Sequence, residues 1–95
     1  MKILAGTSKG LFEIENGSAN LILNAKGVRE VVRFDHDIFV GTGQGLFVSK
    51  DFAAHWSAPK LVDYTVWQVR RALDGTLYAG TYPAALFKSS DGGDT

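Results

Sequence analysis

The sequence predicts an all-β fold made of repeated four-stranded antiparallel units. Apolar runs of four to six residues, rich in Val, Ile, Leu and Phe, alternate with clusters of Gly, Asn, Asp and Ser. No apolar spacing of three and four residues continues long enough for an amphipathic helix. Finally, a phrase that ends in Gly-Thr and is followed by Leu-Phe occurs three times, which places Phe12, Phe47 and Phe87 at intervals of 35 and 40 residues.

The strands are assigned in chain order from the apolar runs and from the turns between them. Residues that adopt positive φ, or that cap the backbone with a side chain, separate the runs as hairpins require. These turn signals are Asn16-Gly17, Asp35-His36-Asp37, Gly43-Gln44-Gly45 and Asp74-Gly75. We expect ten strands, over residues 2–7, 10–15, 20–24, 29–34, 38–42, 45–49, 56–62, 65–71, 76–81 and 85–89. Consecutive hairpins with a four-strand period favour sheets arranged radially over a two-sheet sandwich.

The composition is that of one small globular domain. Of the 95 residues, 45% are hydrophobic and 21% are charged. Ten basic and ten acidic side chains cancel, which gives no electrostatic reason to expect nucleic acid or a membrane surface as a partner. The chain has no cysteine, so disulfides and thiolate metal sites are excluded. The first apolar run is too short for a signal peptide, and no run approaches the ~20 apolar residues of a membrane span, so we expect a soluble, cytoplasmic protein.

A polar motif follows two copies of the Leu-Phe pair. Residues 89–95 read Ser-Ser-Asp-Gly-Gly-Asp-Thr, and residues 49–56, at the same offset from Phe47, read Ser-Lys-Asp-Phe-Ala-Ala-His-Trp. The motif resembles the Asp-box, Ser-x-Asp-x-Gly-x-Thr-Trp, of BNR-repeat β-propellers such as sialidases, photosystem II assembly-factor propellers and sortilin-like ectodomains. The first of these copies in the chain departs from it with Ala53 in place of Gly and His55 in place of Thr. The matching positions are Ser49, Asp51, Trp56, Ser89, Asp91, Gly93 and Thr95.

The resemblance implies a partial β-propeller whose four-stranded antiparallel blades carry Asp-box turns. Residues 1–24 would form strands B to D of a first blade, residues 25–62 the four strands of a second, and residues 63–95 strands A to C of a third. A closed propeller has about four to eight blades. Because unpaired edges and uncapped repeats promote association, we expect the ring to be completed by further blades of a longer chain or by homo-oligomerisation.

The carboxylates of the Asp-box are expected to be structural. A short side chain such as that of Asp51 accepts hydrogen bonds from backbone N–H groups of its own turn, and the Gly of the motif permits positive φ. Trp56 is expected to bury its ring between neighbouring blades. In the Asp35-His36-Asp37 segment, adjacent side chains point in different directions and no third ligand that could join them is visible, so neither a metal site nor another cofactor is predicted.

The resemblance also narrows the ligand-binding candidates. In propellers of this kind the ligand site lies around the central channel, on the face that carries the B–C loops and the crossovers between blades. The candidates on that face are Lys9, Gln44 and Tyr82 from B–C loops, and Arg29, Glu30, Tyr64 and Trp67 from the crossovers and first strands. Each has a structural alternative, as a solvated charge or as a packing aromatic.

Two functions remain open at the level of the sequence. The first is a binding or scaffolding module that recognises a glycan or a protein partner on the crossover face. The second is part of a glycoside hydrolase, which in sialidases needs an arginine cluster, a tyrosine nucleophile activated by a glutamate, and an aspartate acid/base. Four arginines would supply cations, but the chain has no Arg-Ile-Pro motif and no convincing inward-facing pair of carboxylates. Catalytic residues are therefore left unassigned, as is the question of whether the protein is an enzyme.

Overall fold

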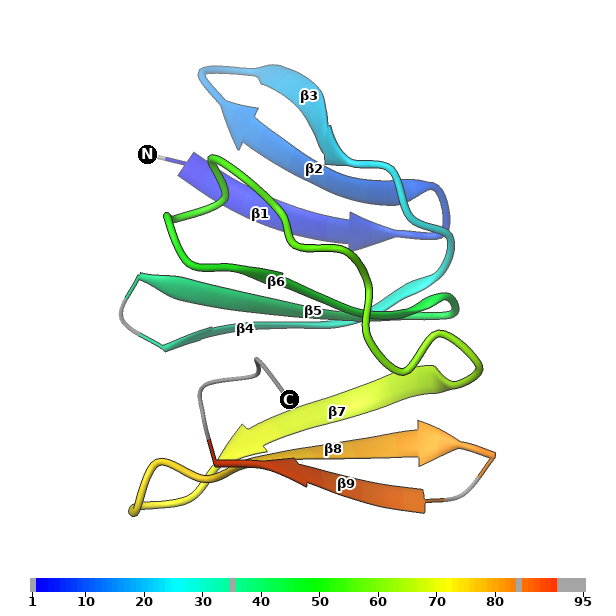
Figure 1. The fold of residues 1–95 in the computed structure, drawn as a ribbon. Coiled ribbons are helices and arrows are strands. Elements are labelled where there is room, and N and C mark those ends of the chain that lie inside the picture. Colours follow the sequence, from blue (N-terminus) through cyan, green and yellow to red (C-terminus); the bar gives the residue numbers. More distant parts are fainter. Residues whose placement is uncertain (1, 35, 84, 91–95) are drawn as a thin grey trace.

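The computed structural model describes residues 2–34, 36–83 and 85–90, which fold into three small antiparallel β-sheets without a helix (Figure 1). Each sheet is a three-stranded meander formed by one contiguous stretch of chain. The strands are β1 (Lys2–Thr7), β2 (Gly10–Glu15), β3 (Ser18–Leu23), β4 (Val28–Phe34), β5 (Asp37–Thr42), β6 (Gly45–Ser49), β7 (Thr65–Arg71), β8 (Leu77–Tyr82) and β9 (Ala85–Ser89). The all-β prediction is therefore confirmed. The described part of the chain has no helix that is long and apolar enough to span a bilayer.

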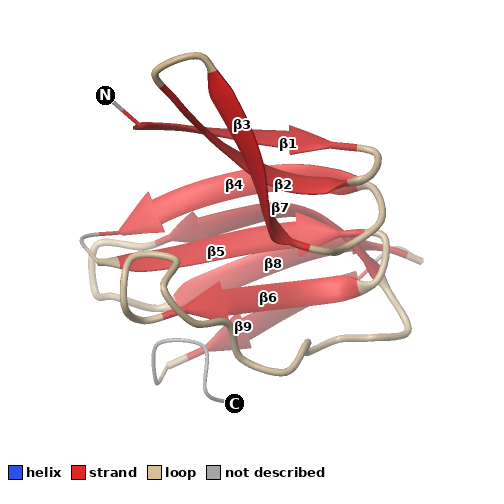
Figure 2. Ribbon diagram, turned by 90° about the horizontal axis from the view of Figure 1, so that it is seen from above, coloured by secondary structure: helices blue, strands red, loops and turns tan. Residues whose placement is uncertain are grey.

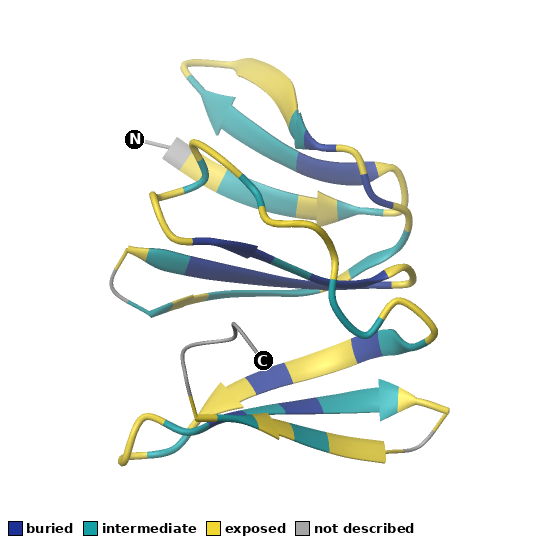
Figure 3. Cartoon of the chain, viewed as in Figure 1, coloured by how far each residue is buried: buried dark blue, intermediate teal, exposed yellow. Residues whose placement is uncertain are grey.

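The three sheets are layered in chain order. The sheet β1–β3 lies next to β4–β6, which lies next to β7–β9, and seen from above the layers largely overlap (Figure 2). Contacts between layers run mainly through β4, which packs on β1, and through β7, which packs on both β4 and β5. In Figure 3 the middle sheet carries the longest buried stretches, whereas β3 and β9 are mostly exposed. The molecule thus has one sheet covered on both faces and two sheets covered on one.

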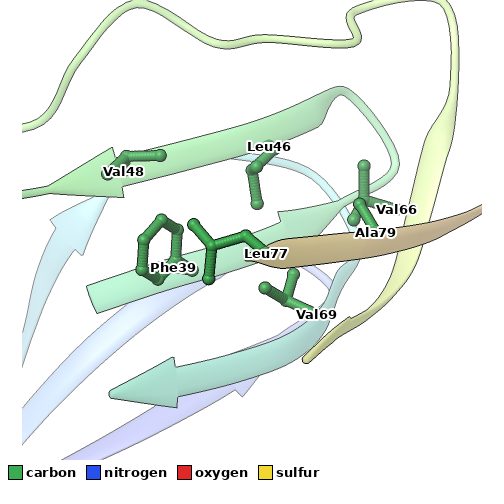
Figure 4. Packing of buried hydrophobic residues seen from close by; sticks show 7 residues of the cluster. All are labelled: Phe39, Leu46, Val48, Val66, Val69, Leu77 and Ala79. Carbon is green, nitrogen blue, oxygen red and sulfur yellow. The ribbon is translucent and has the colours of Figure 1, made fainter. Parts of the chain in front are cut away.

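Two apolar cores hold these layers together. Alternation along β5 directs Ile38 and Val40 toward the first sheet and Phe39 toward the third, because successive side chains of a strand point to opposite faces. The core between the first and second sheets comprises Leu11, Leu23, Ala25, Ile38 and Val40. The core between the second and third sheets, shown in Figure 4, comprises Phe39, Leu46, Val48, Val66, Val69, Leu77 and Ala79.

The glycine of the repeated Gly-Thr phrase lets neighbouring layers approach closely. A Cβ on Gly41 would lie 2.5 Å from the carbonyl oxygen of Val66 on β7, and a Cβ on Gly6 would overlap the side chain of Val28 on β4. Gly80 occupies the corresponding place in the third sheet, where an added Cβ would meet nothing within 4 Å. The same residue type therefore serves interlayer packing in two sheets and faces open space in the last.

The threonine of the repeated phrase locks the turn that follows it. The hydroxyl of Thr7 donates to the carbonyl oxygen of Gly10 at 2.8 Å, and that of Thr42 donates to the carbonyl oxygen of Gly45 at 2.8 Å. In the third sheet, the hydroxyl of Thr81 donates to the carbonyl oxygen of Pro83 at 2.9 Å. Each threonine Oγ thus donates to a carbonyl oxygen in or next to the turn that follows its strand. The three-fold occurrence of Gly-Thr has a structural cause that sequence reasoning had not identified.

The strand expected over residues 56–62 is not formed, so this prediction was wrong. The segment makes one isolated bridge to β6, in which the N–H of Leu46 donates to the carbonyl oxygen of Lys60 at 2.7 Å and the reverse bond is 2.8 Å long. Pro59 has no N–H to extend the ladder, and Leu61 adopts a positive φ of 55° that turns the chain away. The second sheet therefore has three strands and a bridged segment, not four full strands.

Candidate functional site

Turns and crossovers from the first two sheets are bonded together at one end of the layers, on the right in Figure 1. The N–H of Gly27, in the crossover between β3 and β4, donates to the carbonyl oxygen of Ser8 at 3.0 Å. The N–H of Gly43 donates to the carbonyl oxygen of Lys26 at 3.1 Å, and the side-chain oxygen of Gln44 accepts from the N–H of Lys26 at 2.9 Å. Hydrogen bonds therefore join the loops at this end of the molecule, and the side chain of Gln44 takes part in them.

At this end, β4 and β7 each contain a β-bulge at the same place in the repeat. Val28 pairs with Thr42 and Glu30 with Gly41, which leaves Arg29 without a partner on β5. In the third sheet the ladder likewise passes over Trp67, since its two flanking residues pair with consecutive residues of β8. A bulge bends its strand and redirects the side chain of the extra residue, and bulges are enriched next to functional sites.

The two bulged residues meet across the interface between the second and third sheets. The Cζ of Arg29 lies 4.7 Å from the ring centroid of Trp67, within the range of a cation–π contact. Trp67 nevertheless keeps 47% of its surface exposed. A large aromatic ring with a guanidinium against it is thus available to a ligand.

An ion pair lies on the same two strands. The Nη1 of Arg70 on β7 donates to the Oε1 of Glu30 on β4 at 2.6 Å and to the carbonyl oxygen of Val69 at 2.9 Å. The carboxylate of Glu30 is half-buried, whereas the guanidinium of Arg70 is largely exposed. We call Arg29, Glu30, Trp67 and Arg70 the β4–β7 cluster. Arg70 had not been predicted as a site residue.

The remaining candidates are placed differently. The ring of Tyr64 packs edge-on against Phe87 with centroids 4.9 Å apart, so Tyr64 helps to cover the second core. Tyr82 is exposed where β8 ends. Lys9 is exposed in the turn between β1 and β2, where its N–H donates to the hydroxyl of Thr7 at 3.1 Å. Of the seven predicted ligand residues, all within the described ranges, the structure brings only Arg29 and Trp67 into direct contact with each other, whereas Glu30 pairs with Arg70.

The first Asp-box-like segment forms a turn closed by its own side chains. The Oγ of Ser49 donates to the Oδ1 of Asp51 at 2.9 Å and accepts from the N–H of Ala53 at 2.8 Å. The Oδ1 of Asp51 also accepts from the N–H of His55 at 2.8 Å, while its Oδ2 lies 2.5 Å from the Nδ1 of that histidine. The side-chain hydrogen bond from His55, followed by the backbone bond from His55 and the bond from Ser49, lowers the pKa of Asp51 to about 2.

The backbone of this turn explains the residue types of the motif. Ala53, which stands where the Asp-box has Gly, adopts a φ of 73°, and Phe52 adopts a φ of 61°. Both values lie in the left-handed region that glycine occupies most easily. Trp56 packs against the core between the first and second sheets. In the other copy Ser89 ends β9, while Asp91, Gly93 and Thr95 lie outside the described residues.

Within the ranges that the structure describes, no three His, Asp or Glu side chains gather closely enough to hold a metal ion. A cavity of about 150 Å³ lies between the second and third sheets, with a lining that includes Phe39, Leu46, Val69, Leu77 and Phe87. Such an apolar wall suits hydrocarbon rather than a polar sugar or a charged group. The β4–β7 cluster, with its charged side chains beside an exposed ring, is instead a candidate for a polar ligand.

Comparisons of this chain with protein-family models, with curated proteins and with solved structures find no match. The arguments for its function therefore rest on its own residues and geometry.

Proposed function

We propose that the chain is a segment of an Asp-box β-propeller and acts as a binding module that recognises a glycan at the β4–β7 cluster. The observation that carries this proposal is the pair of equivalent bulges that bring Arg29 onto the ring of Trp67. Bulges that aim a side chain at the same point from two successive repeats indicate a site built by the repeat, not an accident of one loop.

The chemistry of the cluster suits a sugar. An exposed indole ring offers a flat apolar surface for the C–H face of a pyranose, and its rim is polar. Arg29, Glu30 and Arg70 provide donors and acceptors for hydroxyl or acidic substituents, and bonds to charged groups are stronger than neutral ones. A few polar groups beside an aromatic platform are the usual composition of a small-ligand site.

Three features support the propeller part of the proposal. The sheets are meanders of similar size layered in chain order, the Asp-box segment at residues 49–56 is a side-chain-closed turn, and the repeated Gly-Thr phrase occupies equivalent places in all three sheets. A four-stranded blade would be completed in the second sheet by the segment that already bridges to Leu46.

A binding measurement tests the function. The chain is screened against a panel of neutral and acidic oligosaccharides, and the best binder is titrated calorimetrically into wild-type protein, Trp67→Ala and Trp67→Phe. We expect Trp67→Ala to weaken binding about tenfold or more, roughly 1.4 kcal/mol, because the stacking surface is lost. Trp67→Phe keeps a ring and should retain most of the affinity.

The control is Leu73→Ala, in the exposed turn between β7 and β8, which should leave binding unchanged. Equal affinities for wild-type protein and Trp67→Ala would contradict the site. Hydrolysis of chromogenic glycosides by purified wild-type protein would instead favour the hydrolase alternative.

A further inference from the structure

The third sheet leaves uncovered the face that the first two sheets bury. Leu11, Leu46 and Leu86 are equivalent, because each pairs with the glycine of the repeated phrase in its own sheet. Leu11 and Leu46 are 0% and 8% exposed beneath the next sheet in chain order, whereas Leu86 is 71% exposed. We call the side of the third sheet that carries Leu86 its front face.

The first sheet leaves uncovered the opposite face. Ile38 and Leu77 are 0% and 6% exposed against the preceding sheet, whereas Ile3, at the equivalent place in β1, is 51% exposed. Leu21, paired with Phe12 on the same side, is half exposed as well. We call this side of the first sheet its back face.

The two uncovered faces correspond to the two sides of the interfaces that neighbouring sheets form within this chain. Wherever two sheets meet in this molecule, a front-face Leu is covered by a back-face Ile or Leu and by neighbouring apolar residues of the next sheet. The front face of the third sheet supplies Leu86, with Tyr78 and Lys88 beside it where the second sheet has Phe39 and Val48. The back face of the first sheet supplies the exposed Ile3 and Leu21 and the partly buried Phe12. One docking would therefore bury both faces, whereas an unrelated partner on Leu86 would leave the row around Ile3 exposed.

We propose that the front face of the third sheet docks onto the back face of the first sheet of a second copy of this chain, and that two copies close head to tail. This rests on the propeller arrangement of the proposed function. Two copies supply two such dockings and six sheets, which lies within the range of about four to eight in closed propellers. A head-to-tail contact that closes on itself gives a finite ring and not a filament.

The docking is compatible with the open space at Gly80. A Cβ added to Gly6 or Gly41 would meet β4 or β7, the first strands of the sheets that follow them. In the described residues, the first sheet begins with β1, the strand equivalent to β5 and β8, and so brings no strand to that place. The docked copy covers Leu86 and leaves the neighbourhood of Gly80 open.

Sedimentation equilibrium over a wide range of concentration tests the proposal with the chain as it stands. Wild-type protein should sediment at twice its mass of 10.3 kDa. Leu86→Lys and Ile3→Glu alter opposite sides of the contact, and each should raise the dissociation constant about tenfold or more. The double variant places a lysine opposite a glutamate in both dockings and should recover part of the lost association.

Leu73→Lys is the matched control, since it adds a charge at a fully exposed leucine away from both faces and should leave the mass unchanged. Circular dichroism confirms that each variant is folded. A monomer at all concentrations would mean that another occupant, such as a further sheet, covers Leu86, and would overturn the proposal. Loss of association in Leu86→Lys but not in Ile3→Glu would also overturn it, because two front faces would then pair with each other.

The glycan titration separates this result from the proposed function. Trp67 belongs to the β4–β7 cluster and not to the docking faces. A dimer that binds no glycan would contradict only the function, and a monomer that binds glycan through Trp67 would contradict only the docking.

Discussion

At the scale of single residues, Asp51 shows how the turn over residues 49–56, which resembles an Asp-box, is stabilised. Its carboxylate receives hydrogen bonds from the backbone and the ring of His55 and from the hydroxyl of Ser49, so the ionised form is favoured in the folded chain. The motif's Thr is replaced by a histidine in this copy, and the histidine supplies the strongest of the contacts that lower the pKa of Asp51. The aspartate therefore acts on the turn, in agreement with a structural role and with no need for a ligand.

This predicts an acid-dependent contribution to stability. The pKa of Asp51 is lowered from 3.8 to about 2 on folding, so the unfolded chain binds a proton first as the pH falls. The stabilisation by Asp51 is thus complete above about pH 4 and is lost as the pH falls toward 2. Thermal melts should show that the melting temperature of wild-type protein falls more steeply across this window than that of Asp51→Asn.

Asp63→Asn, in an exposed turn, controls for the loss of one negative charge. Parallel pH profiles of wild-type protein and Asp51→Asn would contradict the assignment.

At the scale of elements, the hairpins are closed by their own threonines. Thr42 is fully buried, and its Oγ both donates to the carbonyl oxygen of Gly45 and accepts from the N–H of Gln44 at 2.9 Å. Thr81 donates instead to the carbonyl oxygen of Pro83 in an exposed turn, while the carbonyl oxygen of Ala85, the equivalent of Gly45, is 3.5 Å away. Water can replace a lost bond at Thr81 more easily than at Thr42.

We therefore expect Thr42→Val to destabilise the chain by about 1–3 kcal/mol, because the buried carbonyl oxygen of Gly45 and the partly buried N–H of Gln44 both lose their bond to the Thr42 hydroxyl. Thr81→Val should have a clearly smaller effect. Urea unfolding at constant m-value gives both free energies. Equal losses in the two variants would show that burial of the turn does not matter.

Most of the strands could be predicted from the sequence because alternation and turn chemistry agree there. The apolar runs that form β5 and β6 are separated by a Gly-rich turn, and most of their residues are buried. The segment 56–62 looked like a strand by its apolar content, but Pro59 and the positive φ of Leu61 prevent pairing along its length. Local backbone geometry here outweighs hydrophobicity.

The site was less predictable, for a physical reason. Arg29, Glu30 and Trp67 could be selected because the family resemblance indicated one face, but a bulge shifts a residue without changing its neighbours in the sequence. Arg70 pairs with Glu30 across 40 residues, and no local pattern reports such a contact. The sequence signal for this ion pair would have been two opposite charges on the first strands of successive sheets.

At the scale of the whole molecule, position in the array determines what a residue contributes. Gly41 and Gly80 share one place in the repeat, yet only the former lies under another layer. The middle sheet is covered on both faces, so substitutions there should cost the most.

Substituting alanine at both glycines tests this. Gly41→Ala places a methyl group 2.5 Å from the carbonyl oxygen of Val66 and should destabilise the chain by about 1–3 kcal/mol through overpacking. Gly80→Ala meets open space and removes glycine from a strand, so it should be neutral or stabilising by up to about 1 kcal/mol. Thermal melts at low protein concentration give the comparison, and a destabilised Gly80→Ala would show that this place is covered.

The threonine-locked turns have a consequence for how such a protein could evolve. Each lock lies within the few residues of its own hairpin, so a duplicated copy of the unit carries its own means of closing that turn wherever it is inserted. A gene that gains or loses one unit would thereby change the number of layers without having to redesign this turn.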